Sequence, residues 1–141
     1  MERRSGTERV LILAVERDPH VRALEKFLLE QAGCVVQFAA DGVDGLEAVR
    51  RLRPAVLISE ILVPRLDGLA LCRTVKSDPT LHGTQVVVFS ILAADDRAAE
   101  AGADAFLRKP LNDSLLIETV QKLLARRPEG NLDDEVSLAA S

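Results

Sequence analysis

VLILAVERDP, residues 10–19, begins with six apolar residues and ends in a charged, proline-containing segment. The apolar run is continuous rather than alternating, as in a strand of a parallel sheet that is buried on both faces. Asp18 and Pro19 then supply an N-cap and a first-turn proline for a helix that follows directly. The stretch therefore predicts a strand and a helix joined by a short loop, the repeating unit of an α/β protein.

The same unit recurs along the chain. Five apolar segments are expected to be strands, namely residues 10–15, 35–39, 55–59, 86–89 and 105–107. Five helices are expected after them, at residues 19–32, 43–52, 66–77, 95–101 and 112–125. Gln37 interrupts the second strand and the fifth is short, so we expect these two at the edges of the sheet.

Helical spacing of apolar residues predicts which faces of the first and last helices are buried. The expected faces consist of Val21, Leu24 and Leu28, and of Leu116, Val120 and Leu123. Asn112 is placed to cap the last helix, and Gly33 and Gly102 stand where helices should end.

Right-handed crossovers then favour one arrangement, a (βα)5 doubly wound five-stranded parallel sheet of order 2-1-3-4-5. In such sheets a ligand binds at the carboxyl ends of the strands, near the first and third strands here. The polar residues expected at that edge are Glu16, Arg17, Asp18, Glu60, Ser90 and Lys109.

Composition limits the classes of function. A chain of 141 residues with 48% apolar residues predicts one domain, at residues 10–125, after an N-terminal extension (1–9) and before a flexible acidic tail or linker stub (126–141). The net charge of −4 and the lack of Trp and Tyr argue against direct contact with nucleic acid. Solitary cysteines and the absence of a long apolar run predict a cytoplasmic protein that does not enter a membrane.

Several motifs, in order, resemble those of the receiver domains of bacterial two-component response regulators. VERDP, EILVPRLDG, the FS that ends the fourth strand and EAGADAFLRKP carry the resemblance, which covers residues 8–125. It implies an aspartate at the position of Glu60 that accepts a phosphoryl group, with Mg²⁺ held by it and by an acidic pair after the first strand. Ser90 and Lys109 match the residues that grip the phosphoryl oxygens, and Phe106 matches a switch aromatic, although core packing accounts for a Phe there equally well.

Two positions depart from this pattern. The extra methylene of Glu60 moves its carboxylate by about 1.5 Å, enough to disturb in-line attack. Arg17 replaces an acid expected to bind Mg²⁺, and the formal charges of Glu16, Arg17, Glu60 and Lys109 cancel. We therefore expect Mg²⁺ binding to be weak or absent, with no cofactor, and Arg17 and Lys109 to pair with Glu60 unless Arg17 points into solvent.

A third departure is the spacing of 19 positions from Ser90 to Lys109. It is shorter than the family spacing by about one helical turn and predicts a shortened fourth helix or leading loop.

The sequence thus predicts an atypical receiver that is not an enzyme, has no catalytic residue and binds signalling proteins, with a homodimer possible. One alternative is a conventional phosphorylated switch that uses Glu60 or a nearby aspartate such as Asp18 or Asp67. Another is a module that binds a small anion through Arg17 and Lys109.

Overall fold

The computed structural model describes residues 9–126, which form a five-stranded sheet flanked by helices. The strands are β1 (Val10–Val15), β2 (Cys34–Ala39), β3 (Val56–Ser59), β4 (Gln85–Ser90) and β5 (Ala105–Arg108). The helices are α1 (Pro19–Gln31), α2 (Gly42–Leu52), α3 (Gly68–Ser77), the single 3₁₀ turn η1 (Pro79–Leu81), α4 (Asp95–Glu100) and α5 (Asp113–Ala125).

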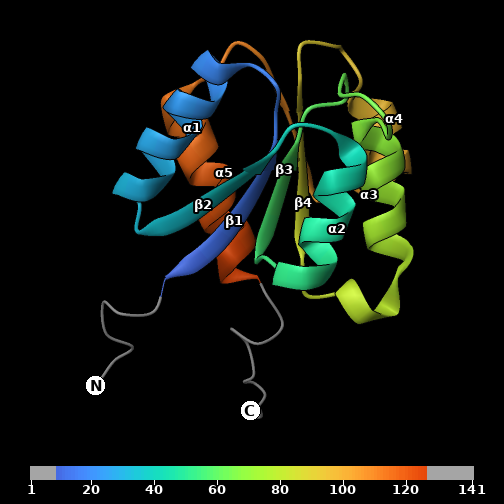
Figure 1. Ribbon diagram of the computed structural model, residues 1–141. Helices are drawn as coiled ribbons and strands as arrows, with labels where there is room; N and C mark the ends of the chain where they lie inside the picture. The colour runs from blue at the N-terminus through green and yellow to red at the C-terminus, as the bar shows by residue number, and fades with distance from the viewer. Residues whose placement is uncertain (1–8, 127–141) are drawn as a thin grey trace.

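All strand pairs are parallel and the order is β2-β1-β3-β4-β5, so the predicted fold class and topology are confirmed. The interrupted strand β2 and the short strand β5 lie at the two edges, as expected. Figure 1 shows α1 and α5 on one face of the sheet and α2, α3 and α4 on the other. The carboxyl ends of all five strands consequently meet at a single edge of the domain.

Alternating strand residues build a separate core on each face of the sheet. In β1, Leu13 and Val15 belong to the core beneath α2, α3 and α4, whereas Ile12 and Ala14 belong to the core beneath α1 and α5. All four are at most 1% exposed. A strand buried on both faces needs a continuous apolar sequence, which explains the run VLILAV.

The predicted helix boundaries rest on local hydrogen bonds. The Asp18 side chain accepts from the backbone N–H of His20 at 2.8 Å, and the Asn112 side chain accepts from that of Leu115 at 3.0 Å. Gly33 and Gly102 follow the ends of α1 and α4 with φ angles of 91° and 90°, in the left-handed region that favours glycine.

The predicted buried face of α1 is partly wrong. Leu24 is 46% exposed, and Glu25, next to it in sequence, is 1% exposed. Positions 21, 25 and 28 follow the i, i+4, i+7 spacing of a helix, so the stripe that faces the sheet passes through Glu25 rather than Leu24. In α5, by contrast, Leu116, Val120 and Leu123 are all buried as expected.

The helix α4 has six residues, in agreement with the predicted shortening between Ser90 and Lys109. The predicted N-terminal extension and C-terminal tail lie almost entirely outside the described residues. Within residues 9–126, none of the helices combines the length and the apolar character that crossing a membrane requires.

Candidate functional site

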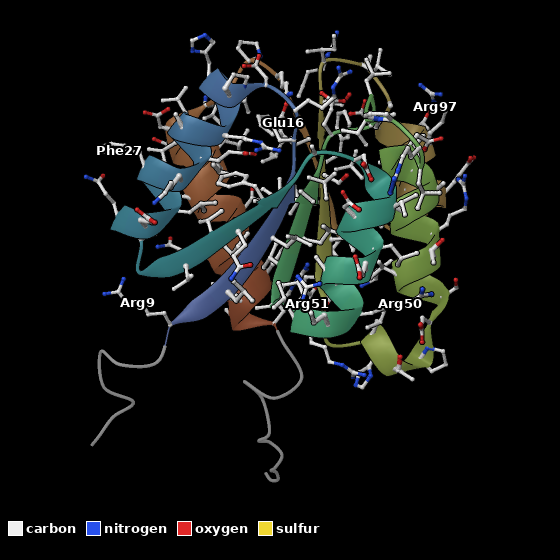
Figure 2. The ribbon with its side chains drawn as sticks, in the orientation of Figure 1. Arg9, Glu16, Phe27, Arg50, Arg51 and Arg97 are labelled. Carbon is white, nitrogen blue, oxygen red and sulfur yellow. The ribbon has the colours of Figure 1, made fainter. Side chains whose placement is uncertain are left out.

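The carboxyl edge of the sheet brings together four of the predicted residues. Glu16 follows β1, Glu60 follows β3, Ser90 ends β4 and Lys109 follows β5. Figure 2 labels Glu16 at this edge, where β1 runs into the loop before α1. Glu16, Glu60 and Ser90 are buried, so their polar atoms depend on other protein groups for hydrogen bonds.

Lys109 bridges the two carboxylates. Its Nζ lies 2.9 Å from Oε1 of Glu16 and 2.9 Å from Oε1 of Glu60. The side chains are only 11% (Lys109), 4% (Glu16) and 7% (Glu60) exposed, so solvent screens this ion pair weakly. Nζ also lies 5.3 Å from the centre of the Phe89 ring, within range of a cation–π contact.

The second carboxylate oxygen of Glu60 is also occupied. Oε2 accepts a hydrogen bond of 2.5 Å from the Ser90 hydroxyl and one of 2.9 Å from the backbone N–H of Leu62. Glu60 thus has an ammonium, a hydroxyl and an amide around one carboxylate. Such charge-assisted hydrogen bonds are stronger than those between neutral groups.

The turn after Glu60 folds tightly against it because of Gly68. The Gly68 N–H donates to the carbonyl of Ile61 at 3.0 Å. A Cβ at this position would collide with the backbone carbonyl of Glu60, so no larger residue allows the same approach. This approach holds the loop that carries the Leu62 amide in place over the Glu60 carboxylate.

The pKa values of the bridged pair shift in the directions that favour charge. Burial alone would raise the pKa of Glu60, but hydrogen bonds from Ser90, Leu62 and Lys109 outweigh it and hold that pKa below its ordinary value. Burial alone would lower the pKa of Lys109, but Glu16 and Glu60 together raise it. Both groups are therefore ionised at neutral pH.

The structure corrects the predicted role of Arg17. Its side chain is exposed, and it forms no ion pair with any residue between 9 and 126. Glu16 turns into the site, and the next residue of an extended segment points the opposite way. Lys109, rather than Arg17, is the cation that faces Glu60. The predicted Glu60–Lys109 contact is therefore present, and of the two alternatives for Arg17 the structure agrees with the one in which it points into solvent.

The donor atoms do not fit a Mg²⁺ ion. Oε1 of Glu16 binds Lys109, and Oε2 accepts from the backbone N–H of Asp18 at 3.2 Å. The oxygens of Glu60 have protein partners as well, and Arg17 supplies no oxygen. No group of three or more His, Cys, Asp or Glu residues suited to a metal occurs in residues 9–126. The available carboxylates serve an internal ammonium instead of a cation that needs six oxygen ligands.

Phe106 lies on β5 and is partly buried against the core beneath α2, α3 and α4. This placement accounts for an aromatic residue at that position through packing alone. Its role as a moving switch aromatic stays a prediction.

Glu25 was not among the site residues predicted from the sequence. Its carboxyl group lies in the α1 interface with the sheet, and neither oxygen has a hydrogen-bond partner in the part of the chain that the structure describes. The signal was present in the sequence, because position 25 is four residues after Val21 and three before Leu28. An acidic residue within such a stripe indicates either an unusual partner or a shifted pKa.

Comparison with known proteins assigns the class that this fold and site define. The family model of the response regulator receiver domain matches residues 12–121, and the chain belongs to that family. Receiver domains are in general not enzymes.

The chain is similar to response regulators from several bacteria. It is 34% identical over 122 residues to the transcriptional regulatory protein CseB of Streptomyces avermitilis, covering 84% of this chain and 51% of the relative. It is 36% identical over 135 residues to the response regulator MprA of Mycobacterium leprae, covering 92% of this chain and 58% of the relative. The chain thus spans about half the length of the curated relatives it matches.

The fold is also that of solved receiver structures. A putative response regulator from Chloroflexus aurantiacus superposes with a TM-score of 0.80 at 30% identity, covering 84% of this chain and all of the other. The beryllofluoride-activated DrrB receiver domain superposes with a TM-score of 0.76 at 25% identity, covering 84% of this chain and all of the other.

One prediction from composition is wrong. The acidic charge argued against direct contact with nucleic acid, whereas the two CseB relatives, from Streptomyces avermitilis and Streptomyces coelicolor, are transcriptional regulatory proteins. The charge of 141 residues says nothing about the half of these relatives that the chain does not match. Net charge was therefore the wrong basis for excluding nucleic acid.

Proposed function

We propose that this receiver domain works without phosphoryl transfer and acts as a protein-interaction module in a bacterial response-regulator pathway. The observation that carries the proposal is the closed hydrogen bonding of Glu60, whose two oxygens contact Lys109, Ser90 and the Leu62 amide. A carboxylate attacks phosphorus through an oxygen lone pair, and here Ser90 and Lys109, which match the residues that would grip the phosphoryl oxygens, already contact the Glu60 oxygens.

The electrostatics of the site support the same conclusion. Lys109 neutralises one of the two carboxylates beside it, so the three groups carry one excess negative charge. A phosphoryl donor is itself an anion and would have to displace Glu16 or Glu60 from Lys109. Breaking this bridge leaves a buried carboxylate without its cation, which is strongly unfavourable.

The nearby aspartates are poor substitutes as phosphoryl acceptors. Oδ1 of Asp18 accepts from His20 as the N-cap of α1, and Oδ1 of Asp67 accepts from the backbone N–H groups of Leu69 and Ala70 as the N-cap of α3. Both carboxylates are therefore already engaged as helix caps. These contacts disfavour the alternative of a conventional switch that uses a displaced aspartate.

The alternative of a small-anion site also lacks support. It required Arg17 and Lys109 to converge, but Arg17 is exposed and Lys109 is shared by two carboxylates. The excess charge at the site is negative, which repels an anion.

The proposal is tested by adding Mg²⁺ and then beryllofluoride, a mimic of a bound phosphoryl group, to the full chain while amide NMR shifts are recorded. We expect the amide chemical shifts of Leu62, Ser90 and Lys109 to stay unchanged. Intact mass after exposure to a small phosphodonor with Mg²⁺ should show no phosphoryl adduct.

A matched variant provides the positive control. The double substitution Arg17→Asp and Glu60→Asp restores the acidic residues of the family pattern, and it should respond to beryllofluoride and accept a phosphoryl group. Saturable shifts that spread from Glu60 to Ser90 in the unmodified chain, or an adduct on it, would overturn the proposal.

The setting of this module is proposed from its relatives. CseB is a transcriptional regulatory protein and MprA a response regulator, so we propose that the chain serves bacterial transcriptional signalling. Its partner is a signalling protein that reads the surface of the locked receiver. The cytoplasmic location and a homodimer stay predictions.

A further inference from the structure

The amino ends of the strands form an edge of the domain that the proposed function does not use. The helices α1, α2, α3 and α5 end at this edge, and cations are favourable in the last turn of a helix. We call the exposed basic residues here the amino-edge basic surface, and they are Arg9, Arg50, Arg51, Arg53, Lys122 and Arg126. Figure 2 labels Arg9, Arg50 and Arg51 along this edge, on the side opposite Glu16.

Backbone contacts bring the arginines of this surface together. The Ala55 N–H donates to the carbonyl of Leu11 at 2.9 Å, so the segments before β3 and β1 lie side by side. These two segments carry Arg53 and Arg9. Arg53 is also the C-cap of α2, whose last turn contains the other two arginines of the surface.

The end of α5 lies at the same edge. Leu123, in its last turn, belongs to the same core cluster as Ala55. Arg126 follows as the C-cap of α5. Residue 127 therefore begins beside the amino-edge basic surface.

Few acids balance the arginines of α2. Arg50 and Arg51 form no ion pair with any residue between 9 and 126, although Glu47 stands one helical turn before them. The guanidinium of Arg53 donates to a backbone carbonyl of η1 at 2.8 Å, a contact that leaves its charge without a carboxylate. Asp78, the N-cap of η1, forms no ion pair in this range either. The cations outnumber these acids, so the potential at this edge is positive.

The sequence that follows α5 has the opposite charge. Residues 127–141 contain one Arg and four acidic residues, three of which are consecutive at Asp133, Asp134 and Glu135. Seven residues separate Arg126 from position 133 and span at most about 23 to 25 Å. A domain of about 100 residues has a radius of gyration of only about 13 Å, so the acidic triplet can reach the arginines of α2.

We propose that the amino-edge basic surface binds an acidic peptide segment, and that this segment is residues 133–135 of the same chain. Its carboxylates pair with the guanidinium groups at the end of α2. Single exposed ion pairs are weak, but covalent linkage gives the segment an effective concentration of about a millimolar, so that several such pairs suffice. An acidic segment of a partner protein would compete for the same arginines. The inference does not depend on the closed site at Glu60.

The test uses the full chain with a nitroxide spin label on Ser137→Cys, close to the acidic triplet. Cys34 and Cys72 are buried, so the label reacts with the new thiol. At low salt, the amide NMR signals of Arg50 and Arg51 should be broadened by the label. Salt at about 1 M shortens the Debye length from about 10 Å at 0.1 M to about 3 Å, and the broadening should then disappear.

Variants on each side of the contact identify the charges involved. Combining Asp133→Asn, Asp134→Asn and Glu135→Gln keeps the sizes of the side chains and should remove the broadening at the end of α2.

The second variant changes the other side of the contact. The double substitution Arg50→Gln and Arg51→Gln should have the same effect. Arg97→Gln is the matched control, because it removes an exposed arginine of α4 and should leave the broadening unchanged.

Three results would overturn the inference. The first is the absence of broadening at the end of α2 at low salt. The second is broadening that persists after the three acids are neutralised. The third is equal broadening in a mixture of an isotope-labelled chain without spin label and a spin-labelled chain without isotope, which would make a second copy the occupant of this surface.

Discussion

Glu60 and Glu25 are both buried glutamates, 6% and 1% exposed, yet their protonation states are opposite. Glu60 has three hydrogen-bonding partners, which hold its pKa below the ordinary value against the effect of burial. Glu25 has none among the described residues, and burial raises its pKa to about 8. The difference teaches that in this domain the partners of a carboxylate, rather than its depth, decide whether it is charged.

Removing the cation from Glu60 should have the largest effect. Lys109→Met retains much of the aliphatic chain but leaves Glu16 and Glu60 buried without a counter-charge. We expect the free energy of unfolding at neutral pH to fall by about 3 to 5 kcal/mol, measured by urea denaturation. The control is Lys26→Met, because the pair with Glu30 is exposed and should contribute at most about 0.5 kcal/mol. Equal losses in the two variants would refute the comparison.

Replacing Glu25 with an apolar residue should stabilise the domain. Glu25→Leu should raise the free energy of unfolding at neutral pH by about 2 kcal/mol, because an unpartnered polar group leaves the core.

The pH dependence of this gain follows from the raised pKa. The unfolded chain releases the Glu25 proton near pH 4.5, whereas the folded chain keeps it until about 8. The stabilising effect of proton binding is therefore complete below about 4.5 and is lost as the pH rises towards about 8. Denaturation at several pH values should show the gain from Glu25→Leu growing across this window, and a gain independent of pH would contradict a raised pKa.

Loss of a single partner of Glu60 should have a smaller effect. Ser90→Ala removes the hydroxyl that donates to Oε2, and we expect a loss of about 1.5 kcal/mol together with a rise in the pKa of Glu60. Carbon-13 titration of the carboxyl group measures the second effect. Ser77→Ala, an exposed helix position, is the matched control and should change stability by no more than about 0.5 kcal/mol. An unchanged pKa of Glu60 would mean that Ser90 does not favour its ionised form.

Arg17 should contribute least to the free energy of unfolding. Arg17→Ala removes an exposed side chain and should change the free energy of unfolding by no more than about 0.5 kcal/mol. A loss of unfolding free energy comparable with that of Lys109→Met would instead support the Arg17–Glu60 ion pair expected from the sequence. Parallel urea denaturation of the two variants settles the question.

The fold and part of the site could be predicted because each depends on local signals. Apolar segments marked the five strands, capping residues and glycines marked several helix ends, and the sheet order followed from the rules for parallel connections. The positions of Glu16, Glu60, Ser90 and Lys109 followed in turn, since parallel strands end at one edge.

The misplaced roles of Arg17, Leu24 and Glu25 share one physical cause. Position in the sequence places a residue on a helix or strand. It does not decide which of two neighbouring residues points its side chain into the protein and which points into solvent. Glu16 is buried and Arg17, the next residue, is exposed. In α1 the expected order is reversed, because Leu24 is exposed and Glu25 is buried.

By itself, the sequence determined a doubly wound α/β receiver fold and the place of Glu60 after the third strand, because residue identity and periodicity are local properties of the chain. Only the tertiary structure decided which charges meet. Lys109 and Glu16 are 93 residues apart and their contact at 2.9 Å exists because β1 and β5 end at the same edge. The tertiary structure likewise decided that Glu25 is buried without a partner, since burial depends on what α1 packs against.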